Sequence, residues 1–501
     1  MDATEIKSPL PPRKIEAEKP FEAEEVVSKP EVLETRNVPP MPEAPIVVKK
    51  KINWKIIFII FGIVVGLIVL VWGINLLIKN NKKETAVTLN YWGLWEDESV
   101  MNGVIADFES KNPTIKINYR RNQLTDYRTR LIGRLAKSGD ETTEGVDIFR
   151  INNTWIPMFR DYLAEVPTET VQTIGLESDF WDVYKTDLKE SGSWLSVPIM
   201  YDGLALFYNK DLLDAAKISV PKNWWELRSS AIKLTSRDGS TGRIKIAGAA
   251  LGMSNSNVDN WSDIVGLMMK QNGIDLSKNN STNDQNLEDV LKFYVSFATG
   301  KDNVWDASLP DSTTLFANGK LAFYFGSTWR VFDIEKINKD LKYGITTVPQ
   351  LPKLGTIDQS DENTSLTDIH WANYWTEGVN SKSKYQKEAW KFLEYLSSAE
   401  VLEKMYTAES QIRNFGEIYP RKSMGDKLKN NQKIWPFVSV ANKATSWYLA
   451  ANTDDAGVNS EMQKYFGDAI TSMKVDSDTA KAMTTLKSGI GQVQLKYKLK
   501  R

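Results

Sequence analysis

Tryptophan is the residue type that gives this sequence its clearest chemical pattern. The chain has 17 tryptophans, and seven of them stand at predicted strand ends or in polar loops rather than on helix faces. An indole offers a flat apolar face and one N–H donor, which match the C–H faces and hydroxyls of a sugar ring. Core packing explains any single one of them equally well, but as a set they predict an aromatic-lined cleft. The seven are Trp92, Trp95, Trp155, Trp261, Trp329, Trp371 and Trp375.

Carboxylate, amide and guanidinium groups lie close to these tryptophans in the sequence. Such groups supply the hydrogen-bond partners that ligand hydroxyls need. Trp329 is the strongest single candidate, because it ends the run GKLAFYFGSTW, where we predict that a buried strand changes to an exposed turn. The polar neighbours are Glu96, Asp97, Asn152, Asn153, Asp202, Asn257, Asp259, Asn260, Arg330 and Asn373.

The sequence excludes much other chemistry by the residues it lacks. Without any cysteine, it has no disulfides, thiolate metal sites, iron–sulfur clusters, cysteine nucleophiles or acylated-cysteine anchor. Its one histidine, His370, lies near Asp368, but no G-x-S-x-G motif occurs, so a hydrogen-bonded histidine is the better interpretation. Nucleotide motifs are absent, and the acidic segment after Asn452 lacks two calcium ligands. We therefore expect no metal, no cofactor and no enzyme, although 64 acidic residues always include some pair at glycosidase spacing.

Composition divides the chain of 501 residues into three regions. Residues 1–48 hold nine of the 19 prolines and ten acidic residues, which predicts a disordered tail. Residues 56–78 are an uncharged run of 23 residues, long enough to cross a ~30 Å hydrocarbon core, so we predict a transmembrane helix at 54–78. Four lysines precede this run and three follow it, a weak bias that places the tail in the cytoplasm. The expected location is the cell membrane, with one pass and the large domain extracytoplasmic.

The remaining region, residues 84–501, alternates between strand and helix patterns. Residues 86–95, 114–119 and 146–152 are predicted strands, separated by two helices with apolar residues four apart. This β-α-β-α-β order predicts a parallel sheet covered by helices. The net charge of the whole chain is −1, from 63 basic and 64 acidic residues, which argues against nucleic-acid binding.

Several phrases of this region, in the right order, resemble the extracytoplasmic solute-binding proteins of ABC importers, in particular the maltose-binding-like sugar branch. The most specific is SVPIMYDGLALFYNKDLLDAA followed by VPKNWWELRSSAIKL. The sequence departs from the family where WANYW replaces a common glycine pair, and in keeping a transmembrane segment. The other phrases are WGLWEDESVMNGVIADFESKNPTIKINY, GVDIFRINNTWIPMF, FANGKLAFYFGSTWRV, YGITTVPQLP, VNSKSKYQKEAWKFLEYLSSAEVLEKMY and YPRKSM.

The resemblance implies an α/β fold of two lobes, the periplasmic-binding-protein fold of type II-like topology. The first lobe would comprise residues 86–199 and 369–430, and the second residues 200–368 and 431–501. Pro198–Asp202 would form the first hinge, and the ligand would bind between the lobes, outside the strand ends.

The implied function is to capture a carbohydrate, a sugar or oligosaccharide, and to deliver it to the permease subunits of an ABC importer. The alternative is a surface glycan receptor or adhesin with the same fold and no permease partner. The expected ligand-binding residues are Trp92, Trp95, Glu96, Asn152, Asn153, Trp155, Tyr201, Asp202, Trp261, Trp329, Arg330, Trp371, Asn373 and Tyr374.

Overall fold

The computed structural model describes residues 54–80, 86–137, 145–254, 257–276, 281–352, 366–475 and 479–499. The chain divides into two units, Met1–Lys82 and Lys83–Arg501. The predicted tail at residues 1–48 lies outside the described residues.

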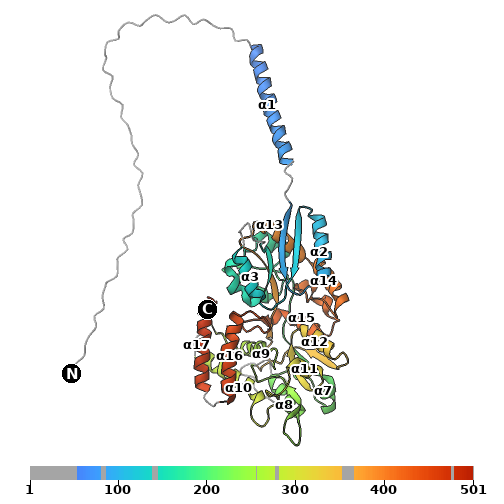
Figure 1. Ribbon diagram of the computed structural model, residues 1–501, viewed down its shortest axis with the longest axis vertical. Helices are drawn as coiled ribbons and strands as arrows, with labels where there is room; N and C mark the ends of the chain where they lie inside the picture. Colours follow the sequence, from blue (N-terminus) through green and yellow to red (C-terminus); the bar gives the residue numbers. More distant parts are fainter. Residues whose placement is uncertain are drawn as a thin grey trace, which may run out of the picture. The chain divides into compact units, whose positions relative to one another are not determined.

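The first unit contains one described helix, α1 (Trp54–Asn80), which is 27 residues long and labelled in Figure 1. It coincides with the predicted transmembrane segment. Among the residues whose side chains are described, no helix is long and apolar enough to cross a membrane. The predicted helix is confirmed, and its membrane crossing is not.

The first sheet of the second unit has the strand order β12-β3-β1-β2. Strand β1 pairs in parallel with β2 and β3, and β12 pairs antiparallel with β3, so the predicted β-α-β-α-β order is confirmed. Asp97 caps α2 by accepting from the Ser99 N–H, and Val100, Val104 and Phe108 form the buried face of that helix. The elements are β1 (Val87–Gly93), α2 (Glu98–Lys111), β2 (Ile115–Arg121), α3 (Tyr127–Ala136), β3 (Ile148–Asn152), β12 (Trp375–Val379), α13 (Gln386–Leu396) and α14 (Ala399–Ile412).

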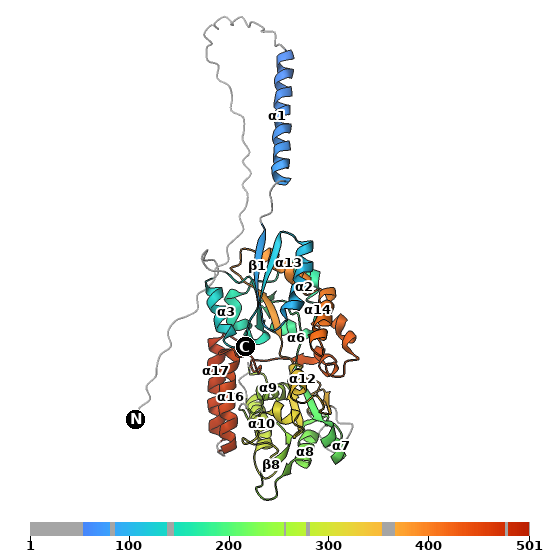
Figure 2. The ribbon, with the colours of Figure 1, turned by 45° about the vertical axis from the view of Figure 1, so that its right-hand side comes forward.

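The second sheet has the order β10-β6-β9-β8-β7 and forms the core of a second lobe. Its central strand β9 is buried at every position, which matches the apolar run seen in the sequence. Figures 1 and 2 both show α7 to α12 around this lobe, away from β1, α2 and α3 of the first. The elements are β6 (Ala205–Asn209), α7 (Lys210–Ala216), α8 (Trp224–Leu234), β7 (Ser236–Arg237), β8 (Ile244–Ala249), α9 (Trp261–Gln271), α10 (Ser281–Val295), α11 (Ser312–Ala317), β9 (Leu321–Gly326), α12 (Trp329–Ile337) and β10 (Tyr343–Thr346).

Short paired segments carry the chain between the lobes. Gly203 forms a bridge with Ala372, and β11 (His370–Trp371) pairs in parallel with β13 (Ala444–Thr445). Gly203 has no room for a side chain, because a Cβ there would meet the Trp371 carbonyl oxygen at 2.5 Å. The C-terminal helices α16 (Val458–Val475) and α17 (Thr479–Lys496) pack on each other, and α16 packs on α10. The predicted lobe boundaries stay predictions.

The remaining short elements connect these parts. They are α4 (Ile156–Phe159), α5 (Thr168–Ile174), α6 (Asp182–Asp187), β4 (Lys189–Glu190), β5 (Ser193–Trp194) and α15 (Trp435–Val438), with short 3₁₀ turns at Asn153–Trp155, Arg160–Tyr162, Ser296–Ala298, Lys422–Leu428 and Ala441–Lys443.

Trp329 does not end a strand, contrary to the sequence-based expectation. Strand β9 ends at Gly326, and Trp329 is the first residue of α12. Thr328 already has helical backbone angles, and the Arg330 N–H donates to the Ser327 carbonyl, so the chain turns into a helix within two residues. The indole therefore stands at a helix start beside the strand end.

Candidate functional site

A cavity of about 290 Å³ lies where the two lobes meet. Its walls come from the segment after β1, the start of α9, the segment from the end of β9 to the start of α12, and the crossing segments. This is the expected place for a ligand in an α/β protein, outside the carboxyl ends of strands. The lining residues are Trp95, Leu124, Met200, Asp202, Gly203, Asn260, Asp263, Ser327, Trp329, Arg330, Asn373, Trp375, Ala451 and Asn452.

Three indoles meet at this cavity. The Trp95 ring contacts Trp329 edge-to-face at a centroid distance of 5.1 Å and Trp375 at 5.0 Å. Trp95 follows β1 in the first lobe, whereas Trp329 begins α12 in the second, so the first of these contacts joins the lobes. Edge-to-face aromatic pairs stabilise by about 0.5–1.5 kcal/mol beyond their buried area. The aromatic wall of the cavity is thus shared between the lobes.

Asp263, in the first turn of α9, organises the polar part of the cavity. Its Oδ1 accepts from the Trp371 indole N–H at 2.8 Å, from the Ala451 N–H at 3.0 Å and from the Asn373 amide at 3.3 Å. Its Oδ2 accepts from the Asn260 amide at 2.9 Å. Burial raises the pKa of Asp263, while these four donors act in the opposite direction. The carboxyl thereby fixes two amide side chains, Asn260 and Asn373, at the cavity wall.

Asp202 is the second buried carboxyl group of the cavity. Its Oδ1 accepts from the Gly203 N–H at 2.8 Å and the Thr328 N–H at 3.2 Å, and its Oδ2 accepts from the Thr328 hydroxyl at 2.9 Å. Burial raises the pKa of Asp202 to about 7, although the hydrogen bonds from Gly203 and Thr328 lower it. Asp202 therefore connects the first crossing segment to the start of α12 and titrates near neutral pH.

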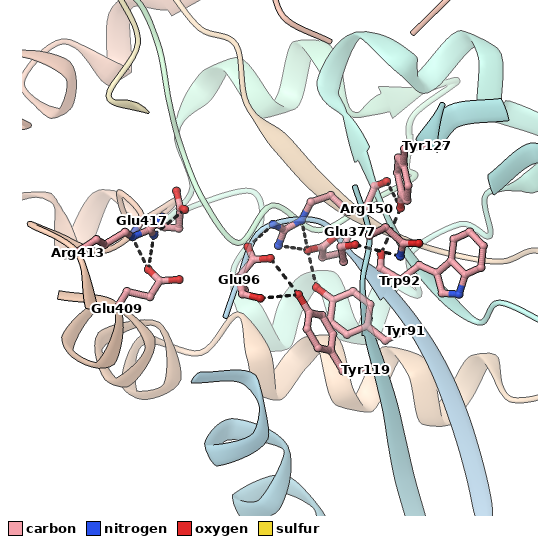
Figure 3. Close-up of polar contacts among 12 residues, drawn as sticks. Tyr91, Trp92, Glu96, Tyr119, Tyr127, Arg150, Glu377, Glu409, Arg413 and Glu417 are labelled. Carbon is pink, nitrogen blue, oxygen red and sulfur yellow. Dashed lines mark hydrogen bonds and ion pairs between the residues drawn. The ribbon is translucent and has the colours of Figure 1, made fainter. Parts of the chain in front are cut away.

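Two of the cavity tryptophans each have an arginine guanidinium group against the ring. Arg150 lies 5.5 Å from the Trp95 ring centroid, and Arg413 lies 5.7 Å from that of Trp329. Figure 3 shows that each arginine is in turn held by two glutamates, Glu96 and Glu377 for the first and Glu409 and Glu417 for the second.

The structure brings five of the predicted site residues to this cavity: Trp95, Asp202, Trp329, Arg330 and Asn373. Arg330 pairs with Asp333 at 3.0 Å and approaches Asp259 at 4.0 Å, so carboxylates flank its charge on two sides. The predicted residues that do not line the cavity are Trp92, Glu96, Asn152, Asn153, Trp155, Tyr201, Trp261, Trp371 and Tyr374.

Four of those nine residues support the cavity from behind: Trp155, Asn152, Trp371 and Glu96. Trp155 is fully buried and stacks on Phe159 at 5.8 Å. The Asn152 amide donates to the Asn373 side chain at 3.0 Å, and Trp371 donates to Asp263. Glu96 pairs with Arg150 as described above.

The others lie in several different places. Tyr201 is buried in the first crossing, where it forms a bridge with Ile418, and Trp261 is half-buried at the start of α9. Trp92 lines a separate cavity of about 180 Å³ with Arg120. Asn153 and Tyr374 both donate to the carboxyl of the half-buried Asp187, at 2.9 and 2.8 Å.

Sequence reasoning missed part of the lining for identifiable reasons. The sequence marks Asn260 only as a polar neighbour of a tryptophan. Trp375 is one of the seven tryptophans predicted to line a cleft, but it is not among the expected ligand-binding residues, and it begins strand β12. Nothing in the sequence marks Asp263 as a site residue, because acidic residues are common in the first turn of a helix. Ala451 and Asn452 reach the cavity from a distant part of the chain.

A second cavity, also of about 290 Å³, is lined by residues of the first lobe, by Lys270 of α9 and by residues of the C-terminal part of the chain. Asn153, Asp187, Lys270, Trp447 and Tyr448 are among its lining residues. The Asp187 carboxyl already accepts three hydrogen bonds there, from Asn153, Tyr374 and Ser446. In the first cavity, by contrast, indoles from both lobes and two buried carboxyl groups converge at strand ends, which makes it the stronger candidate site. Among the described residues no cluster of three or more Asp, Glu or His side chains is arranged to hold a metal ion.

The two sheets, the paired crossings and the cavity between the lobes define a two-lobe α/β solute-binding fold. Residues 103–417 match the family described as bacterial extracellular solute-binding protein. This match covers more than half of the chain, and the protein belongs to that family. The resemblance noted in the sequence is thus confirmed.

Individual relatives are similar at low identity. The multiple sugar-binding protein of Streptococcus mutans is 23% identical over 372 residues, 72% of this chain and 81% of that protein. A putative binding protein of Brucella abortus is 22% identical over 344 residues, 66% of this chain and 76% of that protein.

Solved structures show the same fold. The sugar-binding protein MalE of Xanthomonas citri superposes with a TM-score of 0.61 at 19% identity, over 83% of this chain and all of that one (100%). A solute-binding protein of Thermotoga lettingae, bound with alpha-D-tagatose, has a TM-score of 0.59 at 19% identity, over 82% of this chain and 99% of that one. At these identities the likeness establishes the fold.

Proposed function

We propose that this protein is a carbohydrate receptor that binds its ligand in the cavity between Trp95 and Trp329 and delivers it to an ABC importer. The observation that carries the proposal is the convergence of indoles from both lobes with Asp202 and the Asp263-anchored amides on one cavity. Aromatic faces suit the C–H faces of a sugar, and carboxyl and amide groups suit its hydroxyls. The Streptococcus mutans and Xanthomonas citri proteins are both sugar-binding proteins, which supports the same class of ligand.

Two lining side chains also keep polar atoms without a hydrogen-bond partner among the described residues. These are the Trp95 indole N–H and the Asn260 amide oxygen. A buried polar group without a partner costs about 1–3 kcal/mol. A sugar hydroxyl both donates and accepts, and in the proposed complex ligand hydroxyls pair with these two atoms as the lobes adjust around the sugar.

We further propose that α1 anchors the receptor in the membrane, with residues 1–48 in the cytoplasm and the Lys83–Arg501 unit outside. The described side chains of α1 are apolar on all sides and exposed, for example Phe58 at 67%, Leu67 at 57% and Trp72 at 71%. A helix that is apolar all round requires an apolar surrounding. The description of the family as extracellular supports the outside location of the binding domain. The receptor is proposed to turn over nothing, since binding and delivery need no acid–base pair.

A titration of the purified protein with mono- and oligosaccharides tests the proposal. A sugar face that covers roughly 60 Å² of the Trp329 indole contributes about 1.5 kcal/mol, which is about tenfold in affinity. Trp329→Ala should therefore raise the dissociation constant at least about tenfold. Trp447→Ala, at a half-buried tryptophan of the second cavity, is the matched control and should leave affinity unchanged.

The reverse pattern, in which Trp447→Ala abolishes binding and Trp329→Ala does not, would move the site to the second cavity. Absence of binding to any carbohydrate would refute the proposed ligand class. A neighbouring pair of permease genes distinguishes an importer receptor from a surface glycan receptor without a permease.

A further inference from the structure

The two tryptophans that meet across the cavity share an arrangement that their ligand role does not explain. Each has a guanidinium against its ring. Each guanidinium is bound by two glutamates, as Figure 3 shows. The Arg413 Nη2 donates to Glu409 and Glu417, both at 2.8 Å. A planar guanidinium stacked on an aromatic face restricts the ring more than a lysine ammonium does.

The two arginines differ in which lobes they join. Arg150 lies on β3 and its partner Glu377 on β12, so that cluster belongs entirely to the first lobe, as does Trp95. Arg413 directly follows α14, which packs on α2 of the first lobe, whereas Trp329 begins α12 of the second. The contact between Arg413 and Trp329 therefore crosses the lobe boundary.

The residues next to Arg413 also hold α12. Phe415 packs on Phe332 of α12 at a centroid distance of 4.7 Å. The Asn414 amide donates to Glu335, near the end of the same helix, and the Lys433 ammonium pairs with that carboxylate. The segment Arg413–Phe415 thus contacts α12 from its first turn to its last, so any rotation of one lobe against the other must change these contacts.

Stability alone does not account for the Arg413 cluster. The Glu409 side chain is 4% exposed, and its Oε1 and the Arg413 Nε have no hydrogen-bond partner among the described residues. A buried ion pair with unpaired atoms is weak support for a fold, because desolvation offsets its attraction. A role in holding the indole explains why charged groups stand at this place.

We propose that Arg413 is a positioning residue of the cavity, which holds the Trp329 indole from the opposite lobe and so sets both the lobe angle and the ligand affinity. This inference rests on the proposed function, because the ligand is taken to bind between Trp95 and Trp329. Without Arg413 the indole has more freedom, and the ligand must order it on binding. Affinity falls while the binding stoichiometry stays the same.

The absence of cysteine allows the lobe angle to be measured directly. Spin labels on Lys391→Cys, on α13, and Lys233→Cys, on α8, report the distance between the lobes, since both lysines are exposed. In the full-length, ligand-free protein, Arg413→Gln should broaden the distance distribution. The same variant should bind the sugar identified by titration about tenfold more weakly than the wild type. Arg413→Lys should show both effects as well, because an ammonium group does not replace the planar guanidinium against the ring.

The matched control is Arg421→Gln. Arg421 pairs with Asp179 at 2.8 Å and lies 4.6 Å from the Phe180 ring, so it has the same kinds of contact within the first lobe. It should lower the melting temperature and leave affinity and the lobe distance unchanged. If Arg413→Gln does not fold, Glu417→Gln, which leaves Arg413 one carboxylate, should show the same two effects in weaker form.

The proposal is wrong if the Arg413 and Glu417 variants keep the affinity and the distance distribution of the wild type. It is also wrong if Arg421→Gln changes both properties as much as Arg413→Gln does. The distance measurement needs no ligand. A protein that binds no sugar but whose lobes loosen with Arg413→Gln refutes the proposed function and supports the positioning role.

Discussion

Replacement of Asp202 by asparagine should remove a defined part of the pH dependence of folding. Burial raises the pKa of this carboxyl from 3.8 to about 7, so the folded protein binds its proton more tightly than the unfolded chain. Because the folded pKa is raised, stability is highest at low pH and falls as pH rises from about 4 to about 7. A pKa rise of about 3 units corresponds to a total loss of about 4 kcal/mol in unfolding free energy as the pH increases. About 2.5 kcal/mol of this loss occurs between pH 5 and pH 8.

An amide preserves the contacts of the protonated carboxyl. It can accept from the N–H groups of Gly203 and Thr328 and donate to the Thr328 hydroxyl, and it carries no charge at any pH. Urea denaturation of both proteins at pH 5, 6, 7 and 8 measures the difference in unfolding free energy. Asp202→Asn should become more stable relative to the wild type by about 2.5 kcal/mol across this range. Burial also raises the pKa of Glu409 to about 7, so Glu409 makes the stability of both proteins depend on pH. Subtracting the unfolding free energy of the wild type from that of Asp202→Asn removes this shared contribution.

Asp179 provides a control of opposite sign. Burial raises its pKa, but hydrogen bonds from Arg421 and Ser423 outweigh burial and leave the pKa lowered. The stability it contributes is complete above its unfolded pKa of about 4, so Asp179→Asn should lower stability by a constant amount between pH 5 and pH 8. A difference between wild type and Asp202→Asn that does not change with pH would refute the reasoning about Asp202.

Three further experiments test the buried Trp155 indole, the Arg150 cluster and the proposed topology. Trp155→Ala should lower the unfolding free energy by about 3–5 kcal/mol, measured by urea denaturation, because the indole is fully buried in the first lobe; a loss below 1 kcal/mol would contradict this. Arg150→Gln should destabilise by about 3–5 kcal/mol, since it leaves the buried carboxylates of Glu96 and Glu377 unpaired; a loss below 1 kcal/mol would contradict this view of the cluster. Protease added to intact cells should remove the Lys83–Arg501 unit and spare the tail, and protection of that unit would exclude the proposed topology.

The regular elements of the first lobe could be predicted because their signals are local. Val100, Val104 and Phe108 lie four residues apart and form the buried face of α2, as the spacing indicates. The strand β1 lies within the predicted range 86–95 and ends at Gly93, two residues before the end of that range. The end of β9 was predicted three residues too late, because Ser327 and Thr328 fit a strand end or a helix start equally well by residue type.

The cavity could be predicted only in part. Trp95, Asp202, Trp329, Arg330 and Asn373 were named because each stands next to a predicted strand end or crossing. Trp155 has the same sequence context as Trp95 and is nevertheless fully buried. The type of residue and its local neighbours do not record on which side of a turn the side chain packs.

The sequence by itself determined the alternation of strands and helices and the absence of thiol chemistry, because these depend on short-range spacing and on composition. The class of protein followed from the resemblance of its ordered phrases to a known family. The tertiary structure alone decided which groups meet. Asp263 contacts Trp371 and Ala451, which lie 108 and 188 residues further along the chain, and Arg413 lies against Trp329 from the other lobe. Such pairs form because the sheets of the two lobes and the segments that cross between them bring distant parts of the chain to one place, and a linear pattern carries no information about that distance in space.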